Sequence, residues 1–128
     1  MVVDSSALVA ILLREEEADE IEMKLVLSTG SSISAANYVE TCMVMARESG
    51  DDGFRQVDKL LEQMSIHIHS VTIADSLLAR DAFLRYGKGR HPAGLNFGDC
   101  FSYALAKRLG EPLLFKGNDF SLTDAPPA

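Results

Sequence analysis

The sequence has no tryptophan and only two cysteines among its 128 residues. Cys42 and Cys100 lie far apart in the chain, and both fall in segments whose apolar residues have helical spacing. This count and spacing exclude a disulfide framework and a cysteine-rich metal site. A free cysteine inside a helix usually behaves as a small buried hydrophobic residue, and we expect that role for both.

The sequence also lacks a long hydrophobic run and a basic leader. No apolar stretch reaches the roughly 18 residues that a membrane-spanning helix needs. The N-terminal stretch MVVDSSALVAILL has no basic segment before it, and three glutamates follow at positions 15–17, which is unlike a secretory signal peptide. These features predict a cytoplasmic protein with no membrane partner.

Positive charge is in deficit, because 12 Lys and Arg residues face 19 Asp and Glu residues and give a net charge of −7. Taken alone, this balance discourages binding to a polyanion such as nucleic acid. The distribution is uneven, however: residues 1–75 contain 14 acids and 5 bases, whereas residues 76–128 contain 5 acids and 7 bases. A polyanionic partner would therefore be met mainly by the C-terminal half.

Short apolar segments alternate with helical patterns along the whole chain. Strands are predicted at residues 1–4, 31–34, 66–71 and 111–115, and helices at 5–13, 15–27, 35–50, 51–64, 72–87 and 98–110. Such alternation is typical of a parallel sheet with helices on both faces. The sequence therefore predicts a single α/β domain over residues 1–128, with three α/β/α layers, a central parallel sheet and a loose C-terminal tail.

Four acidic residues stand at positions that such a fold could bring to one end of its sheet. Asp4 closes the first predicted strand, Asp99 opens an apolar helix, and Asp119 follows the last predicted strand. Glu40 lies on an otherwise apolar helix face, where an unpaired charge is costly. Structural roles are open to each: the aspartates as helix caps or turn residues, and Glu40 as a partner of Arg47 or as a side chain that reaches solvent.

Taken together, these acids are a candidate cation site, because the ligand crevice of a parallel α/β sheet lies beyond the carboxyl ends of its strands. Carboxylates without cysteine or closely spaced histidine favour hard cations, so Mg²⁺ or Mn²⁺ is the predicted cofactor rather than Zn²⁺. Such an ion commonly serves phosphate chemistry, since it neutralises phosphate charge and lowers the pKa of a bound water.

Three stretches, taken in order, resemble the PIN domain. They are MVVDSSALVAIL at the N-terminus, SAANYVE with its Glu40, and GLNFGDCFSYALAKRLGEPLLFKGNDFSLTD from Gly94 to Asp124. More narrowly, they resemble the toxin of VapBC-type bacterial toxin–antitoxin modules, and the resemblance covers essentially the whole chain. It implies a PIN-like α/β/α fold and a metal-dependent endoribonuclease that cleaves RNA with a metal-activated water and leaves 5′-phosphate and 3′-hydroxyl ends.

The same resemblance implies the catalytic residues. Asp4, Glu40 and Asp99 match the first three acidic positions of the family. The fourth position departs from the frequent pattern T-x-D-x-D-F. Gly117 stands where one of those acids would be, which leaves Asp119 as the nearest match and Asp124 as the alternative.

In this scheme the first and third aspartates, Asp4 and Asp99, are the main metal ligands. Glu40 and Asp119 bind a second ion or orient water. Ser6 matches a small hydroxyl residue beside the first aspartate and holds a metal-bound water.

The resemblance also implies partners: an RNA substrate such as tRNA or rRNA, a VapB-like antitoxin whose C-terminal segment enters near the acidic pocket, and a second copy in a homodimer formed through the early helices. Phosphate contacts are expected from the basic half of the chain, at Lys88, Arg90, His91, Lys107, Arg108 and Lys116.

Two other functions remain open from the sequence alone. A receiver-like regulatory domain would need paired acids after the first strand, whereas Asp4 is followed by Ser5 and Ser6. A catalytically inactive PIN fold that serves as a binding module is the second alternative, and it is kept open by the Gly117 departure.

Overall fold

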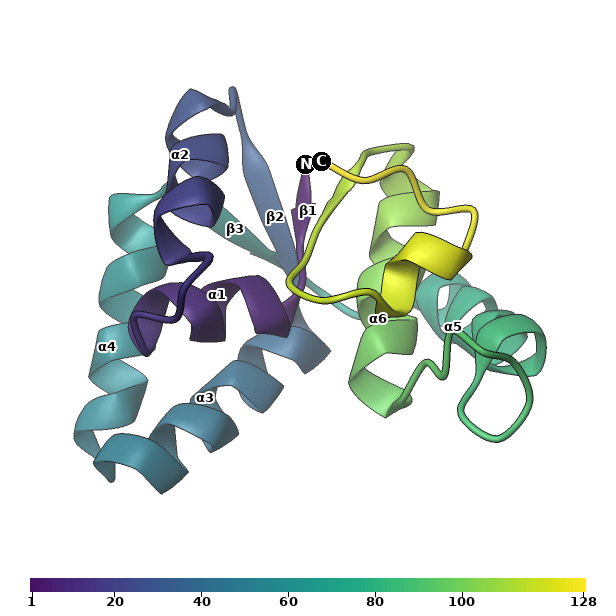
Figure 1. Ribbon diagram of the computed structural model, residues 1–128, viewed down its shortest axis with the longest axis horizontal. Coiled ribbons are helices and arrows are strands. Elements are labelled where there is room, and N and C mark those ends of the chain that lie inside the picture. Colours follow the sequence, from purple (N-terminus) through teal and green to yellow (C-terminus); the bar gives the residue numbers. More distant parts are fainter.

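A four-stranded parallel sheet with strand order β3-β2-β1-β4 forms the centre of the computed structural model, which describes residues 1–128. The strands are β1 (Val2–Val3), β2 (Ser31–Ser34), β3 (Ile66–His69) and β4 (Leu113–Leu114). The helices are α1 (Ser5–Leu12), α2 (Ala18–Leu27), α3 (Ala35–Ser49), α4 (Asp52–Gln63), α5 (Ile73–Tyr86) and α6 (Phe97–Leu109), and a 3-10 helix η1 (Asp119–Leu122) follows β4. Figure 1 shows α1 to α4 on one side of the sheet, and α5, α6 and η1 on the other. The predicted three-layer α/β/α fold is confirmed.

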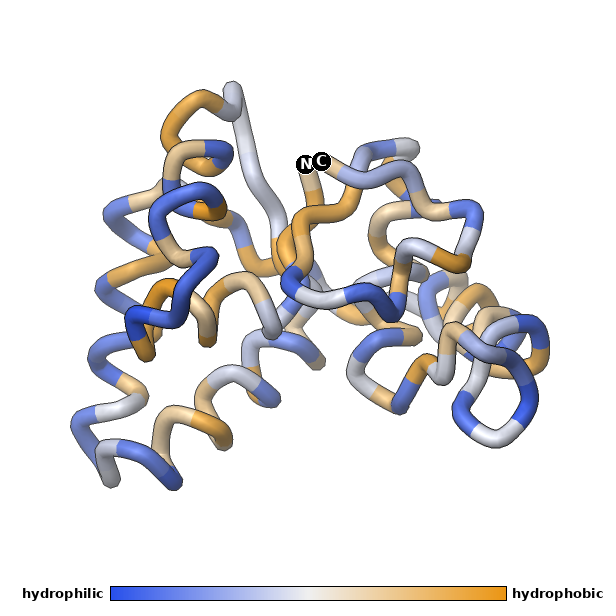
Figure 2. Tube along the Cα trace, in the orientation of Figure 1, coloured by the Kyte–Doolittle hydropathy of each residue, from blue (hydrophilic) through white to orange (hydrophobic).

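Neighbouring strand residues point into two separate cores, because side chains alternate between the two faces of a strand. Val3 and Leu114 belong to the core beneath α1 to α4, whereas Val2 and Leu113 belong to the core beneath α5 and α6. Figure 2 shows the hydrophobic residues of β1 at the centre of the molecule, while β2 is paler because three of its four residues are serine. No helix is both long enough and apolar enough to cross a membrane.

The C-terminal tail is tied to the sheet, so the prediction of a loose terminus is wrong. The Leu113 amide donates a hydrogen bond of 2.8 Å to the carbonyl of Pro126, and the Ala128 amide donates one of 2.9 Å to the carbonyl of Leu113. Ala125 is buried in the core beneath α5 and α6. The turn-rich composition of the tail favoured a loose terminus, but the tail runs parallel to β4 at Pro127 and covers its outer edge.

Candidate active site

Asp4 connects β1 to α1 and lies almost completely buried, at 2% exposure. One of its carboxylate oxygens accepts a hydrogen bond of 2.9 Å from the Ser6 amide, which makes Asp4 the N-cap of α1. Helix capping was one of the structural roles predicted for Asp4. The other oxygen accepts a hydrogen bond from the hydroxyl of Ser102, a fully buried residue of α6. The Asp4 carboxylate therefore faces α6 at the carboxyl end of β1.

Asp99 lies in the first turn of α6, although it does not cap the helix itself. The N-cap is Asn96, whose Oδ1 accepts a 2.9 Å hydrogen bond from the Asp99 amide, while Asp99 Oδ2 accepts a 3.0 Å hydrogen bond from the Asn96 amide. This reciprocal capping box satisfies two amides at the start of the helix and fixes the Asp99 carboxylate. The sequence left open that Asp99 is the N-cap, and this alternative is wrong. The N-cap is Asn96, and Asp99 is the third residue of the helix.

Burial and three neighbouring acids raise the pKa of Asp99 to about 7. Burial is the largest cause, because it disfavours the charged form of the carboxyl group, and the hydrogen bond from Asn96 acts in the opposite direction. The negative charges of Asp4, Asp119 and Glu40 raise this pKa further. All four acids singled out in the sequence therefore lie close enough together to act on one ionisation.

Glu40 reaches this group of acids from α3, where it is half-buried. We call the group formed by Asp4, Glu40, Asp99 and Asp119 the acidic pocket. Its carboxylate lies directly against Gly98 at the start of α6, so closely that a side-chain carbon on Gly98 would overlap it. The positive end of the α6 dipole favours a carboxylate at that place. No ion pair joins Glu40 to Arg47, so this structural alternative is wrong.

Asp119 and Asp124 lie in different surroundings. Asp119 is the first residue of η1, and its charge acts on Asp99. Asp124 accepts hydrogen bonds of 2.5 Å from the Tyr103 hydroxyl and 3.0 Å from Lys107 Nζ, and these partners lower the pKa of its carboxyl group. The structure therefore brings Asp119 to the acidic pocket and pairs Asp124 elsewhere.

Ser6 lies on the first turn of α1, beside Asp4. Its Oγ accepts a 3.0 Å hydrogen bond from the backbone amide of Lys116, which anchors the segment after β4 to α1. This contact leaves the hydroxyl proton of Ser6 free to donate, which is the property that the predicted contact with a water requires.

Three of the six predicted phosphate contacts have acidic partners within the chain. Lys107 pairs with Asp124, Arg108 with the buried Asp75, and Lys116 with Glu15 and Glu17. The other three, Lys88, Arg90 and His91, lie in the loop between α5 and α6.

This loop leads directly into the helix turn that holds Asp99. Lys88 and Arg90 are exposed. His91 packs edge-on against Tyr86 and accepts a 3.0 Å hydrogen bond from the Ala93 amide.

The acidic pocket fits a hard divalent cation in its chemistry. Its donors are all carboxylate oxygens, and the negative charges of Asp4, Asp119 and Glu40 add to the effect of burial in raising the pKa of Asp99, so these acids repel one another. No three Asp, Glu, His or Cys side chains form a ready-made coordination cluster. A bound cation would therefore neutralise the repulsion and draw these side chains together.

Two buried polar residues of the pocket were not predicted from the sequence. Ser102 lies three residues after Asp99, and Asn37 lies three residues before Glu40; both are fully buried. Residues three apart on a helix share a face, so this spacing was the available signal. It was missed because serine and asparagine are common in helices for many other reasons.

Beside the pocket, apolar side chains of α3, α5 and α6 remain uncovered. Phe97, the first residue of α6, is 78% exposed and lies between two hollows. One hollow, of about 600 Å³, extends along α3 past Val39 and Met43 and includes Glu40 and Gly98.

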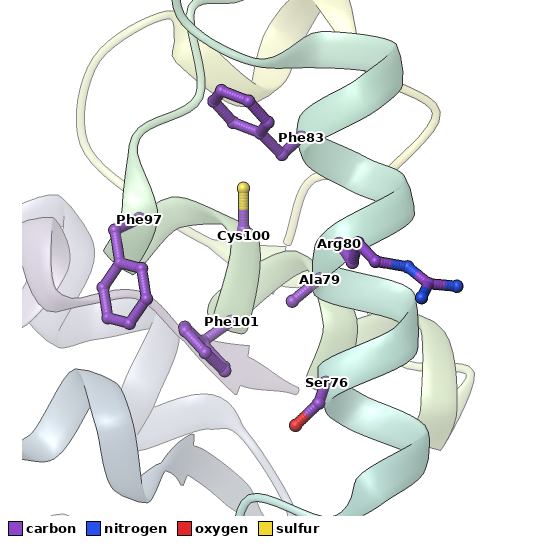
Figure 3. A pocket seen from close by; sticks show the side chains of 7 residues that line it. All are labelled: Ser76, Ala79, Arg80, Phe83, Phe97, Cys100 and Phe101. Carbon is purple, nitrogen blue, oxygen red and sulfur yellow. The ribbon is translucent and has the colours of Figure 1, made fainter.

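The other hollow, of about 420 Å³, lies between α5 and α6. Figure 3 shows the rings of Phe97 and Phe101 on one side of this hollow and Phe83 on another. Arg80 points outward from it. No carboxylate lines this hollow, so it is separate from the acidic pocket.

Comparison with known proteins identifies the fold family. The family model of the PIN domain matches residues 1–126. The chain belongs to the PIN domain family. The resemblance drawn from the sequence is thereby confirmed, and the receiver-like alternative is wrong.

Relatives of this PIN domain with high identity are VapC ribonucleases. A protein named Ribonuclease VapC from Mycolicibacterium smegmatis is 49% identical over 124 residues, which is 97% of this chain and 96% of the relative. Ribonuclease VapC42 from Mycobacterium tuberculosis is 46% identical over 129 residues, which is 100% of this chain and 98% of the relative. These matches show that this PIN domain is of the VapC type.

Solved structures agree on the fold. Mycobacterium tuberculosis VapC20, described as a sarcin–ricin loop cleaving toxin, matches with a TM-score of 0.81 at 17% identity and covers 99% of this chain and 97% of its own. A toxin–antitoxin complex from Klebsiella pneumoniae matches with a TM-score of 0.72 at 15% identity and covers 99% and 95%. At these identities the likeness shows the fold alone.

Proposed function

We propose that this PIN domain is a metal-dependent endoribonuclease and the toxin of a bacterial toxin–antitoxin module. It hydrolyses RNA phosphodiester bonds with a water activated by Mg²⁺ or Mn²⁺. The observation that carries the proposal is the gathering of three acids, from separate segments of the chain, around the buried carboxyl group of a fourth, Asp99. The names of its relatives, which are VapC ribonucleases, give the chemistry.

The residues divide between binding and orientation. Asp4 and Asp99, which are buried and held by hydrogen bonds, would be the main metal ligands. Glu40 and Asp119, which are less buried, would hold a second ion or orient the attacking water, and the Ser6 hydroxyl would donate to that water. When bound, the cation supplies charge neutralisation for the phosphate and lowers the pKa of the water.

Contacts to the RNA backbone are assigned to the loop between α5 and α6. Lys88 and Arg90 are exposed and make no ion pair with an acid of the chain, and His91 is half-buried beside them. Phosphate contacts of this kind position a nucleic acid without specifying its sequence. The exposed face of this loop would offset the repulsion that RNA meets from a protein of net charge −7.

The first expected result is cleavage of total bacterial RNA by the purified protein in the presence of Mn²⁺ or Mg²⁺. EDTA should abolish the cleavage, and excess Mn²⁺ should restore it, because in the proposed mechanism the cation activates the water. Gel electrophoresis follows the fragments. Their ends are then tested with a ligase that requires a 5′-phosphate.

The end chemistry separates this activity from contamination by a metal-independent ribonuclease, which leaves 5′-hydroxyl ends. Ligatable 5′-phosphate fragments, lost with EDTA, would support the proposal. Binding of Mn²⁺ without cleavage of any RNA fraction would instead favour the catalytically inactive binding module.

We also propose a VapB-like antitoxin as the protein partner, with a C-terminal segment that enters near the acidic pocket, in the cytoplasm. Support comes from the VapC relatives and from the structural match to a toxin–antitoxin complex. A cationic side chain of such a segment would pair with acids that repel one another in the free toxin. That pairing would block both the metal and the substrate.

A homodimer is proposed through the apolar face around Phe97 rather than through the early helices, α1 and α2, which the resemblance implied. This face gathers exposed side chains from three helices, including Val39, Met43 and Phe83, at 52%, 53% and 42% exposure. A large aromatic residue surrounded by smaller apolar ones is the usual centre of a protein interface. Because the hollow along α3 also includes Glu40, the second copy would border the acidic pocket.

Phe97→Asp is expected to convert the dimer into a monomer, because it places a charge at the centre of the proposed interface. The matched control is Leu27→Asp, which changes an apolar residue of α2 that is equally exposed, at 75%. Sedimentation equilibrium at micromolar concentration measures the mass of both variants. A dimer disrupted by Leu27→Asp and not by Phe97→Asp would move the interface to the early helices, as the resemblance implied.

A further inference from the structure

One buried side-chain amide, that of Asn37, joins three of the four segments that carry acids of the pocket. Asn37 is fully buried in the first turn of α3. Its Nδ2 donates a 2.9 Å hydrogen bond to the carbonyl of Gly98 on α6, and lies 3.4 Å from Ser5 Oγ and 3.5 Å from Glu40 Oε1. The Ser5 hydroxyl in turn donates a 3.1 Å hydrogen bond to the backbone carbonyl of Asn37. Ser5 directly follows Asp4 in the chain, and Gly98 directly precedes Asp99. Asn37 therefore contacts the neighbours of both aspartates that hydrogen bonds hold in the pocket.

Gly98, the residue of α6 that Asn37 contacts, also leaves the space for the Glu40 carboxylate. A side-chain carbon built on Gly98 would lie 2.5 Å from Glu40 Cδ, with the carboxylate oxygens as its nearest neighbours. The backbone conformation of Gly98 is helical, so its lack of a side chain is not required by the backbone. Glycine at this helical position costs helix stability relative to alanine, which indicates that the space itself is used.

Asn37 has a second unusual property, because its Oδ1 is buried and accepts no hydrogen bond. A buried polar atom without a partner destabilises the folded protein, and such atoms call for another explanation. Asparagine at this position therefore does not serve stability alone. Its Nδ2 contacts Ser5, Glu40 and Gly98, which are the contacts that join α3 to α1 and α6.

We propose that Asn37 and Gly98 are positioning residues that hold the Glu40 carboxylate beside Asp99. Asn37 fixes α3 against the starts of α1 and α6, and Gly98 leaves the space that the carboxylate fills. The inference rests on the proposed function, because it assigns these two residues to the same acidic site. It goes beyond that function in naming residues that touch neither metal nor RNA and still determine the affinity for the cation.

The Gly98→Ala variant tests whether the Glu40 carboxylate needs the space that Gly98 leaves. The new Cβ should displace the Glu40 carboxylate and weaken Mn²⁺ binding by about tenfold, since residues that orient metal ligands typically contribute about 10–100-fold. The melting temperature of the metal-free protein should be unchanged or higher, because alanine is the better helix former. Opposite changes in affinity and stability would not arise from damage to the fold.

Gly30→Ala is the matched control. Gly30 has no atom within 4 Å of the position that a Cβ would take, and its φ does not require glycine. We expect this variant to bind Mn²⁺ as the wild type does. Isothermal titration with Mn²⁺ measures the affinities, and circular dichroism in EDTA measures the melting temperatures.

A double-mutant cycle shows whether Gly98 acts through Glu40. Glu40→Gln removes the charge whose placement matters, so adding Gly98→Ala to Glu40→Gln should cause little further loss of Mn²⁺ affinity. Asn37→Leu, which keeps the volume and removes the donor, should weaken Mn²⁺ binding about tenfold in the wild-type background. In the Glu40→Gln background, Asn37→Leu should likewise cause little further loss of Mn²⁺ affinity.

Wild-type Mn²⁺ affinity in Gly98→Ala would overturn the inference, as would independent and multiplicative losses in the cycle. Either result leaves the proposed ribonuclease standing if the wild type cleaves RNA. Failure of the wild type itself to bind Mn²⁺ would overturn the metal-dependent function together with this inference. The affinity and the cleavage assay thus report on the two proposals separately.

Discussion

Asp99→Asn is expected to abolish RNA cleavage while the PIN fold remains intact. Asparagine has the same size, and its side-chain oxygen can still accept the hydrogen bond that the Asn96 amide donates to Asp99, so α6 keeps its capping box. The substitution removes the negative charge that would bind the cation at the start of α6. The loss of activity should be about 100-fold or more, which is the scale for groups that determine metal affinity.

Asp124→Asn is the matched control, because it makes the same chemical change outside the pocket. Asp124 interacts with Tyr103 and Lys107 rather than with the other acids. Cleavage of total RNA in Mn²⁺ should therefore be lost in Asp99→Asn and kept in Asp124→Asn, with both variants folded by circular dichroism. Equal cleavage by wild type and Asp99→Asn would place the active site elsewhere or point to a contaminating nuclease.

Most of the fold follows from local sequence signals. Every predicted strand and helix is present, because turn and cap residues interrupt the apolar pattern at the element ends. Thr72 and Asp75, for example, have the spacing of a capping box, and both hydrogen bonds of the box are present at the start of α5. The tail is different, since its pairing with β4 depends on a strand edge that no local signal near Pro126 and Pro127 describes.

The acidic pocket was predictable in kind rather than in detail. The rule that ligand crevices lie at the carboxyl ends of parallel strands brought Asp4 and Asp99 together from distant parts of the sequence. The choice between Asp119 and Asp124 needed the structure, because it depends on the course of the segment after β4. The acidic partners of Lys107, Arg108 and Lys116 were also not predictable, because charge counts do not show which residues pair with one another.

The metal-free protein is expected to become less stable as the pH rises from 5 to 8. Burial and the neighbouring acids raise the pKa of Asp99 from 3.8 in the unfolded chain to about 7 in the folded protein. Between these values the folded state binds a proton that the unfolded state has released. The stabilisation is therefore complete below pH 3.8 and is lost as the pH rises through 7. From pH 5 to 8 the free energy of unfolding should fall by roughly 2–3 kcal/mol.

Thermal unfolding in EDTA at pH 5, 6, 7 and 8 measures this loss, which should appear as a decrease of about 5–10 °C in melting temperature. Asp99→Asn should remove most of the dependence, because an amide does not titrate. Comparing the two proteins cancels the titration of the three histidines, which both contain.

Saturating Mn²⁺ should raise the wild-type melting temperature more at pH 8 than at pH 6, since the cation and the proton compete for the same carboxylate. Parallel curves for wild type and Asp99→Asn would mean that Asp99 is already ionised at pH 5. The acids would then not repel one another strongly enough to require a cation. A melting temperature that Mn²⁺ leaves unchanged at both pH values would likewise remove the pocket as a metal site.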